Sequence, residues 1–90
     1  MVDESNFSLY ERLSIAAASI MLEDKERKYE LVDKEDGFYV LRSYRHADSR
    51  DFHEISSAYF QGNRRISGSE KLELELEEKF YDFFNKYLLR

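Results

Sequence analysis

The densest set of reactive side chains in this 90-residue sequence lies between His46 and Glu54. It contains two histidines and three carboxylates, which are groups that bind metal ions and transfer protons: His46, Asp48, Asp51, His53 and Glu54. The two histidines lie seven residues apart, whereas a pair that binds one metal from a helix is three or four residues apart. Asp48 and Asp51 suit the start of a helix instead. We therefore predict no metal site and no catalytic group here.

Other catalytic and cofactor motifs are also missing from the sequence. The serines do not stand in the G-x-S-x-G frame of hydrolases, and the three glycines form no phosphate-binding loop. The absence of cysteine excludes a disulfide scaffold and a thiolate zinc site. The sequence therefore predicts a protein that is not an enzyme, holds no cofactor and has no small-molecule ligand.

The positively charged side chains in the middle of the chain are five arginines. Residues 37–69 carry a balance of +2 and no lysine, whereas residues 1–36 carry −5 and residues 70–90 carry −2. Guanidinium groups bind carboxylates and phosphates through paired hydrogen bonds. Two interpretations stay open, contact with an anion or nucleic acid and neutralisation of this chain's own carboxylates. The candidate residues are Arg42, Arg45, Arg50, Arg64 and Arg65.

The elements that position these residues follow from apolar spacing, in a chain that is 42% hydrophobic and 37% charged. A helix is predicted over about residues 8–26, with Ser8 and Glu11 spaced as a capping box. A β-hairpin is predicted over about 28–45, because an Asp-Gly pair separates two β-rich runs. With Asp33 opposite Phe38, one face would carry Tyr29, Leu31, Phe38, Val40 and Tyr44.

Two more helices are predicted after the hairpin. One spans about residues 49–61, from the spacing of Phe52, Ile55 and Tyr59 to a stop at Gly62. The other spans about 70–89. A short third strand near Ile66 is the alternative for the segment between them. The prediction is a single α+β domain over 1–90, in the order α-β-β-α-α, with an antiparallel hairpin packed against helices.

The last helix carries apolar side chains beyond those that one core needs. Its core stripe runs from Leu72 to Tyr87, and a second stripe is formed by Leu74, Tyr81 and Leu88, with Phe84 between the two stripes. Either the first helix or another chain must cover this stripe, because exposed leucine and tyrosine side chains favour association. We predict these four residues as a partner interface, for a second copy of the chain or for another protein.

The β-β-α order after Asp36-Gly37 and the net charge of −5 resemble small phage-encoded inhibitor proteins, including anti-CRISPR proteins. The resemblance implies an inhibitor or regulatory subunit acting in an infected host cell. The sequence contains no membrane-length apolar run, so we expect a cytoplasmic protein. The leading hypothesis is a non-enzymatic, self-associating protein-binding module. The alternative is a nucleic-acid-binding module that uses the arginines.

Overall fold

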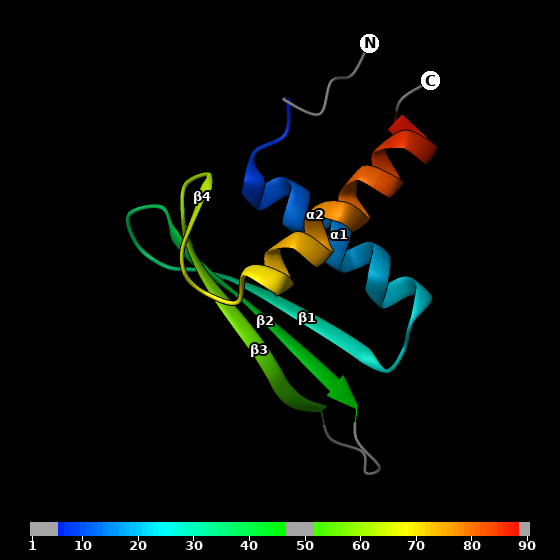
Figure 1. Ribbon diagram of the computed structural model, residues 1–90, viewed down its shortest axis with the longest axis horizontal. Coiled ribbons are helices and arrows are strands. Elements are labelled where there is room, and N and C mark those ends of the chain that lie inside the picture. Colours follow the sequence, from blue (N-terminus) through cyan, green and yellow to red (C-terminus); the bar gives the residue numbers. More distant parts are fainter. Residues whose placement is uncertain (1–5, 47–51, 89–90) are drawn as a thin grey trace.

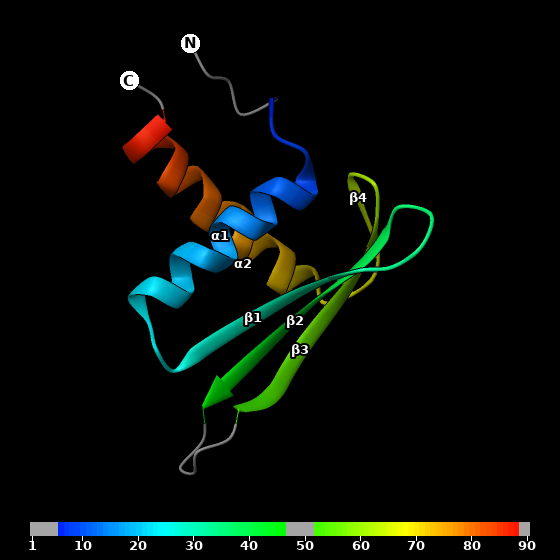
Figure 2. The same cartoon turned by 180° about the vertical axis from the view of Figure 1, so that it is seen from behind.

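The computed structural model describes residues 6–46 and 52–88, which form an α+β fold of two layers (Figure 1). The four strands form an antiparallel sheet in the order β1-β2-β3-β4. Both helices cover the same face of this sheet, as the two opposite views show (Figures 1 and 2). In chain order the elements are α1 (Leu9–Glu23), β1 (Arg27–Asp33), β2 (Phe38–His46), β3 (Phe52–Gln61), β4 (Arg64–Gly68), α2 (Glu70–Phe83) and the π-helical turn η2 (Phe84–Leu88).

The predicted fold class, first helix, hairpin and last helix are confirmed. Ser8 begins α1 with a capping box, in which its Oγ accepts from the Glu11 N–H at 3.2 Å and its N–H donates to Glu11 Oε1 at 2.9 Å. Ser69 begins α2 by accepting from the Leu72 N–H at 3.1 Å. The short strand near Ile66 is also present, as β4.

The prediction of a helix over 49–61 is wrong. Residues 52–61 form strand β3, and residues 47–51 lie outside the described part of the chain. The buried residues of β3 are Ala58 and Phe60, which are two apart as a strand requires. A bulge opposite Ser43 and Tyr44 interrupts this alternation, and Ile55 in the bulge is exposed. The order is α-β-β-β-β-α, so the described residues between the Asp36-Gly37 turn and Gln61, on which the resemblance to phage inhibitors rests, form two strands and no helix.

The hairpin register differs from the prediction by one residue. Asp33 pairs with Tyr39, and the Lys34 N–H donates to the Phe38 carbonyl at 2.7 Å. The loop therefore has three residues, 35–37, with Asp36 and Gly37 at positive φ. The predicted register requires a four-residue loop. Shortening the loop by one residue moves every side chain of β2 to the opposite face of the sheet, so Tyr39 rather than Phe38 faces the helices.

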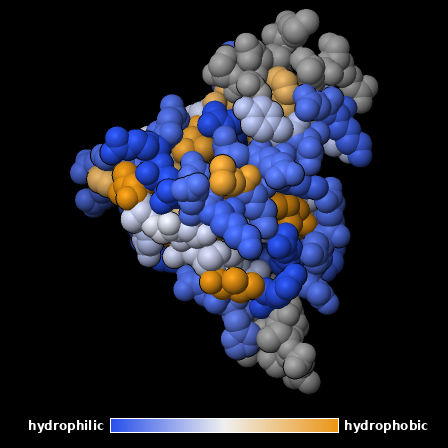
Figure 3. Space-filling view, in the orientation of Figure 1, coloured by the Kyte–Doolittle hydropathy of each residue, from blue (hydrophilic) through white to orange (hydrophobic). Residues whose placement is uncertain are grey.

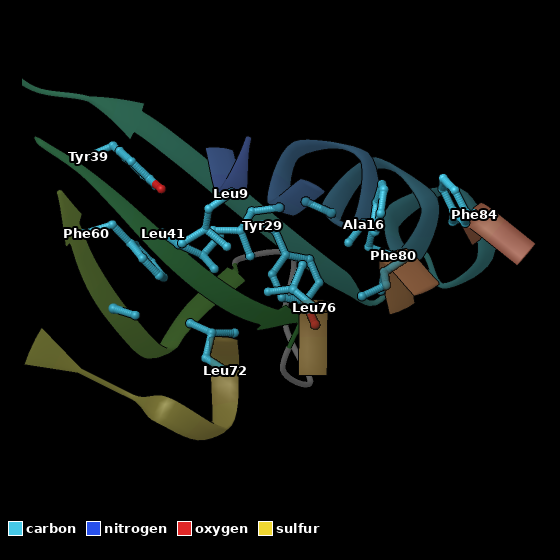
Figure 4. Packing of buried hydrophobic residues seen from close by; sticks show 14 residues of the cluster. Leu9, Ala16, Tyr29, Tyr39, Leu41, Phe60, Leu72, Leu76, Phe80 and Phe84 are labelled. Atoms are coloured by element: carbon cyan, nitrogen blue, oxygen red, sulfur yellow. The ribbon is translucent and has the colours of Figure 1, made fainter. Parts of the chain in front are cut away.

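The core lies between the helices and the inner face of the sheet (Figure 4). Tyr39 and Phe60 stack in parallel with 5.1 Å between ring centroids, and Phe80 meets Phe7 edge-on at 5.5 Å. This packing fixes the ends of the strands relative to α2, and so determines which surface side chains come together. The labelled core residues are Leu9, Ala16, Tyr29, Tyr39, Leu41, Phe60, Leu72, Leu76, Phe80 and Phe84.

Candidate functional site

Of the four residues predicted as an interface on the last helix, two pack in or against the core and two are exposed on the surface. Phe84 is buried in the main core, and Leu88 is half-buried against it. Leu74 and Tyr81 are exposed on the outer face of α2, with 57% and 43% of their surfaces accessible. Helix α1 does not cover them. The second stripe is therefore reduced to two exposed side chains that lie two helical turns apart.

The predicted arginines do not form one patch. Arg42 lies between two carboxylates, with Nη1 3.5 Å from Glu30 Oε1 and Nε 3.4 Å from Glu54 Oε1. Arg65 binds α2, with Nε 3.2 Å from Glu73 Oε1. These two arginines neutralise carboxylates of their own chain.

The remaining arginines occupy separate places. Arg45 is exposed near the end of β2, and Arg64 is exposed at the start of β4. Neither forms an ion pair within residues 6–46 and 52–88. Arg50 lies outside the described residues.

The histidines and carboxylates of residues 46–54 that the structure describes do not gather into one site. His53 is exposed on β3, opposite Arg45, and Glu54 binds Arg42. Asp48 and Asp51 lie outside the described residues, and of His46 only its place in β2 is described. Among the residues that the structure describes, no group of three potential metal ligands exists.

A cavity of about 280 Å³ lies between the sheet and the start of α2. It forms where the N-terminal end of β1, the C-terminal end of β2 and the bulged part of β3 meet the first turns of α2. The described residues that surround it supply serine and tyrosine hydroxyls, three cationic groups and one carboxylate. The lining residues are Arg27, Tyr29, Ser43, Tyr44, Arg45, Ile55, Ser56, Ser69, Lys71, Leu72 and Glu75.

The carboxylate in this cavity is already engaged by its neighbours. The Tyr29 hydroxyl donates to Glu75 Oε1 at 2.8 Å, and Arg27 Nη2 lies 3.6 Å from Glu75 Oε2. Ser43 and Ser56 join their hydroxyl groups at 2.7 Å across β2 and β3. Sequence spacing cannot reveal this arrangement, because the chain brings these groups together from four elements.

Burial and the Glu75 carboxylate raise the pKa of Tyr29 to about 12, and burial raises the pKa of Tyr39 to about 12. Because these values exceed the reference value of 10.0, the neutral hydroxyls contribute stability below pH 10. We predict that this contribution is lost as the pH rises from about 10 to about 12. Urea unfolding across this pH range measures the loss, and NMR of the tyrosine ring carbons measures each ionisation.

The variant Tyr29→Phe provides the control for that experiment. Phenylalanine keeps the buried ring and removes the ionising group, so the alkaline loss of stability should become smaller. Ionisation of Tyr29 near pH 10 in the folded protein would contradict the prediction.

Exposed apolar side chains continue from the cavity along α2. Ile55, with 61% of its surface accessible, lines the cavity, and Leu74 lines the adjoining hollow. Lys71 and Glu75 line both depressions, and Tyr81 follows on the same helix face. We call Ile55, Leu74 and Tyr81 the docking strip. In Figure 3 the apolar side chains of the visible face form separate spots among hydrophilic ones.

The cavity also adjoins a strand edge. Strand β4 pairs only with residues 58–61 of β3. Within the described part of the chain, the outer edge of residues 52–57 has no strand partner, and the Ser69 N–H donates to the Ser57 carbonyl at 2.9 Å where that edge meets α2. The docking strip thus begins beside backbone groups that a ligand can reach.

Comparisons with known proteins give no relative for this fold and surface. No family model, curated protein or solved structure matches the chain. Among the described helices, none has the length and apolar character needed to cross a membrane.

Proposed function

We propose that this chain is a non-enzymatic protein-binding module that binds its partner through the docking strip. The observation that carries the proposal is the exposure of Ile55 and Leu74, each more than half accessible, on adjoining hollows that share Lys71 and Glu75. Burial of a leucine or isoleucine side chain contributes about 1.5–3 kcal/mol. Such a module acts by occupying a surface of its partner, as a small regulatory subunit or inhibitor does.

The charges around the strip favour a different protein over a second copy of this chain. Glu78 lies on α2 between Leu74 and Tyr81. A two-fold axis midway between Leu74 and Tyr81 on α2 would place Glu78 beside its own copy, and like charges in an interface oppose association. A partner with a cationic side chain between apolar ones would instead pair with Glu78.

The alternative hypothesis, nucleic-acid binding by the arginines, has less support. Binding along a phosphate backbone uses several cations on one face. Arg42 and Arg65 are engaged with carboxylates of the same chain, and Arg64 lies at the opposite end of the sheet from Arg45.

Replacing Leu74 by glutamate tests the proposal. We predict that Leu74→Glu weakens partner binding by 10-fold or more, because about 1.4 kcal/mol corresponds to a factor of ten. The unmodified chain is first used to isolate its bound protein from the native host. Calorimetry with that purified protein then gives the affinities of the variants.

The variant Leu22→Glu is the matched control, since Leu22 is an exposed leucine on α1 that lines neither of the two depressions along the strip. It adds the same charge and should leave binding unchanged. Equal loss in both variants would refute the docking strip. Sedimentation gives the second check: a dimer that Leu74→Glu converts to monomer would identify a second copy as the partner, contrary to the charge argument.

A further inference from the structure

The cavity at the start of α2 carries the opposite charge from the protein as a whole. Among the residues that the structure describes, Arg27, Arg45 and Lys71 line it against one carboxylate, that of Glu75, which gives these residues a balance of +2. The whole chain has a net charge of −5. A concave surface with charge of one sign concentrates small ions of the other sign. The cavity therefore attracts anions to a protein that otherwise repels them.

Two of these cations are available to a ligand. Within residues 6–46 and 52–88, Arg45 and Lys71 form no ion pair and no hydrogen bond through their side chains. By contrast, Arg12 has Nε 2.9 Å from Glu77 Oε1, and Arg65 binds Glu73. The Glu75 carboxylate does not compete for Arg45 and Lys71, because Tyr29 and Arg27 already engage it.

The rest of the lining suits an anion that has several acceptor oxygens. Ser56 and Ser69 contribute hydroxyl groups, whereas the Tyr44 hydroxyl donates to Glu30 Oε1 at 3.5 Å outside the cavity lining. The first turn of α2 adds the positive end of a helix dipole. The apolar side chains of Ile55 and Leu72 border these polar groups, so the cavity can also accommodate the carbon atoms to which an anion is attached.

We infer that this cavity binds the phosphate group of a phosphate monoester. Such a group carries about −1.5 to −2 charges at neutral pH and three acceptor oxygens, which matches a lining of +2 more closely than one carboxylate does. Arg45 would bind two of the oxygens through its planar guanidinium, and Lys71 would supply a point charge. The inference goes beyond the proposed function, because an anion site does not require a protein partner.

Titration of the folded protein with inorganic phosphate tests the inference. Amide NMR signals are followed at constant ionic strength, with chloride as the balancing anion. We expect saturable shifts confined to the segments that line the cavity, in 27–29, 43–45, 55–56, 69–72 and 75. We expect Arg45→Ala and Lys71→Ala each to weaken binding roughly tenfold, as the loss of one charge-assisted contact does. Shifts that do not saturate, or that spread over the whole molecule, would overturn the inference.

Matched variants at the other end of the sheet provide the controls. Arg64 and Lys34 are exposed, lie beside the strand turns and do not line the cavity. Arg64→Ala and Lys34→Ala remove the same charges and should leave phosphate binding unchanged. If these variants weaken phosphate binding as much as Arg45→Ala and Lys71→Ala do, net charge alone explains the binding and the proposed site is wrong.

Two further ligands distinguish the source of the phosphate. The first is a short peptide with phosphoserine between two leucines, and the second is the same peptide with serine. Tighter binding of the phosphopeptide than of inorganic phosphate assigns the group to a modified protein. Equal binding assigns it to a small phosphate compound. Tighter binding of the unmodified peptide than of the phosphopeptide would contradict the inference and leave the proposed docking strip standing.

Discussion

Replacing Gly68 by alanine is expected to destabilise the fold by about 4 kcal/mol, the largest effect that we predict for a surface position. Gly68 has a φ of +90°, a conformation that residues with a Cβ rarely adopt. A Cβ placed on it would lie 2.6 Å from both Ala58 Cα and Ser57 O. Both are backbone atoms of β3, so relief requires the strands to separate. Strain of about 1–3 kcal/mol and a similar overpacking cost then add together.

The consequence reaches the cavity, because Gly68 directly precedes the residue that begins α2. Ser69 donates its N–H to Ser57 at 2.9 Å and caps the helix through Leu72. Urea unfolding followed by circular dichroism gives the loss in free energy. Gly62→Ala is the control: its φ is +59° and no atom lies within 4 Å of the added Cβ, so only about 1–2 kcal/mol should be lost. Equal losses in the two variants would show that the contact with β3 is unimportant.

The sequence is sufficient to predict the helices and the first hairpin, but it misidentifies β3. The apolar residues Phe52, Ile55 and Tyr59 recur at helical spacing. Ile55 and Tyr59 are both exposed, so this spacing does not mark the buried face, which Ala58 and Phe60 form two residues apart. The bulge at Ile55 interrupts the alternation on which strand prediction depends. Gly62, which suits a helix end, also suits a tight turn between strands. Pairing with β2 and β4 decides between the two, and pairing is a property of the whole fold.

The candidate site is predictable only in part for a similar reason. Leu74 and Tyr81 follow from helix periodicity, because α2 has one buried face and they lie outside it. The proximity of Ile55 and Lys71 does not follow from periodicity, since it depends on how the bulged part of β3 lies against the first turns of α2. The arginines show the same limit. Their type predicts contacts with carboxylates or phosphates, but only the fold shows that Arg42 makes one contact with Glu30 and one with Glu54.

Replacing Leu76 by alanine is expected to cost about 3 kcal/mol, whereas Leu74→Ala should change stability by less than about 0.5 kcal/mol. The two leucines lie two residues apart on α2, but Leu76 is completely buried and Leu74 is 57% accessible. Removing Leu76 leaves a cavity beneath the helix, while removing Leu74 exposes no new apolar surface. Urea unfolding of the two variants under the same conditions measures both values.

This pair also decides how the alternating Leu72-Glu-Leu74-Glu-Leu76 segment folds. In a strand, the three leucines would share one face and both substitutions would cost about the same. In a helix, a difference of two residues turns a side chain by about 200°, so one leucine lies in the core and the other in solvent. Equal destabilisation would contradict the helix and the docking strip together. The expected result is a large difference in stability, with Leu74→Ala folding normally but losing partner binding. Leu76 would then be the residue that stabilises the fold, and Leu74 the residue that binds the partner.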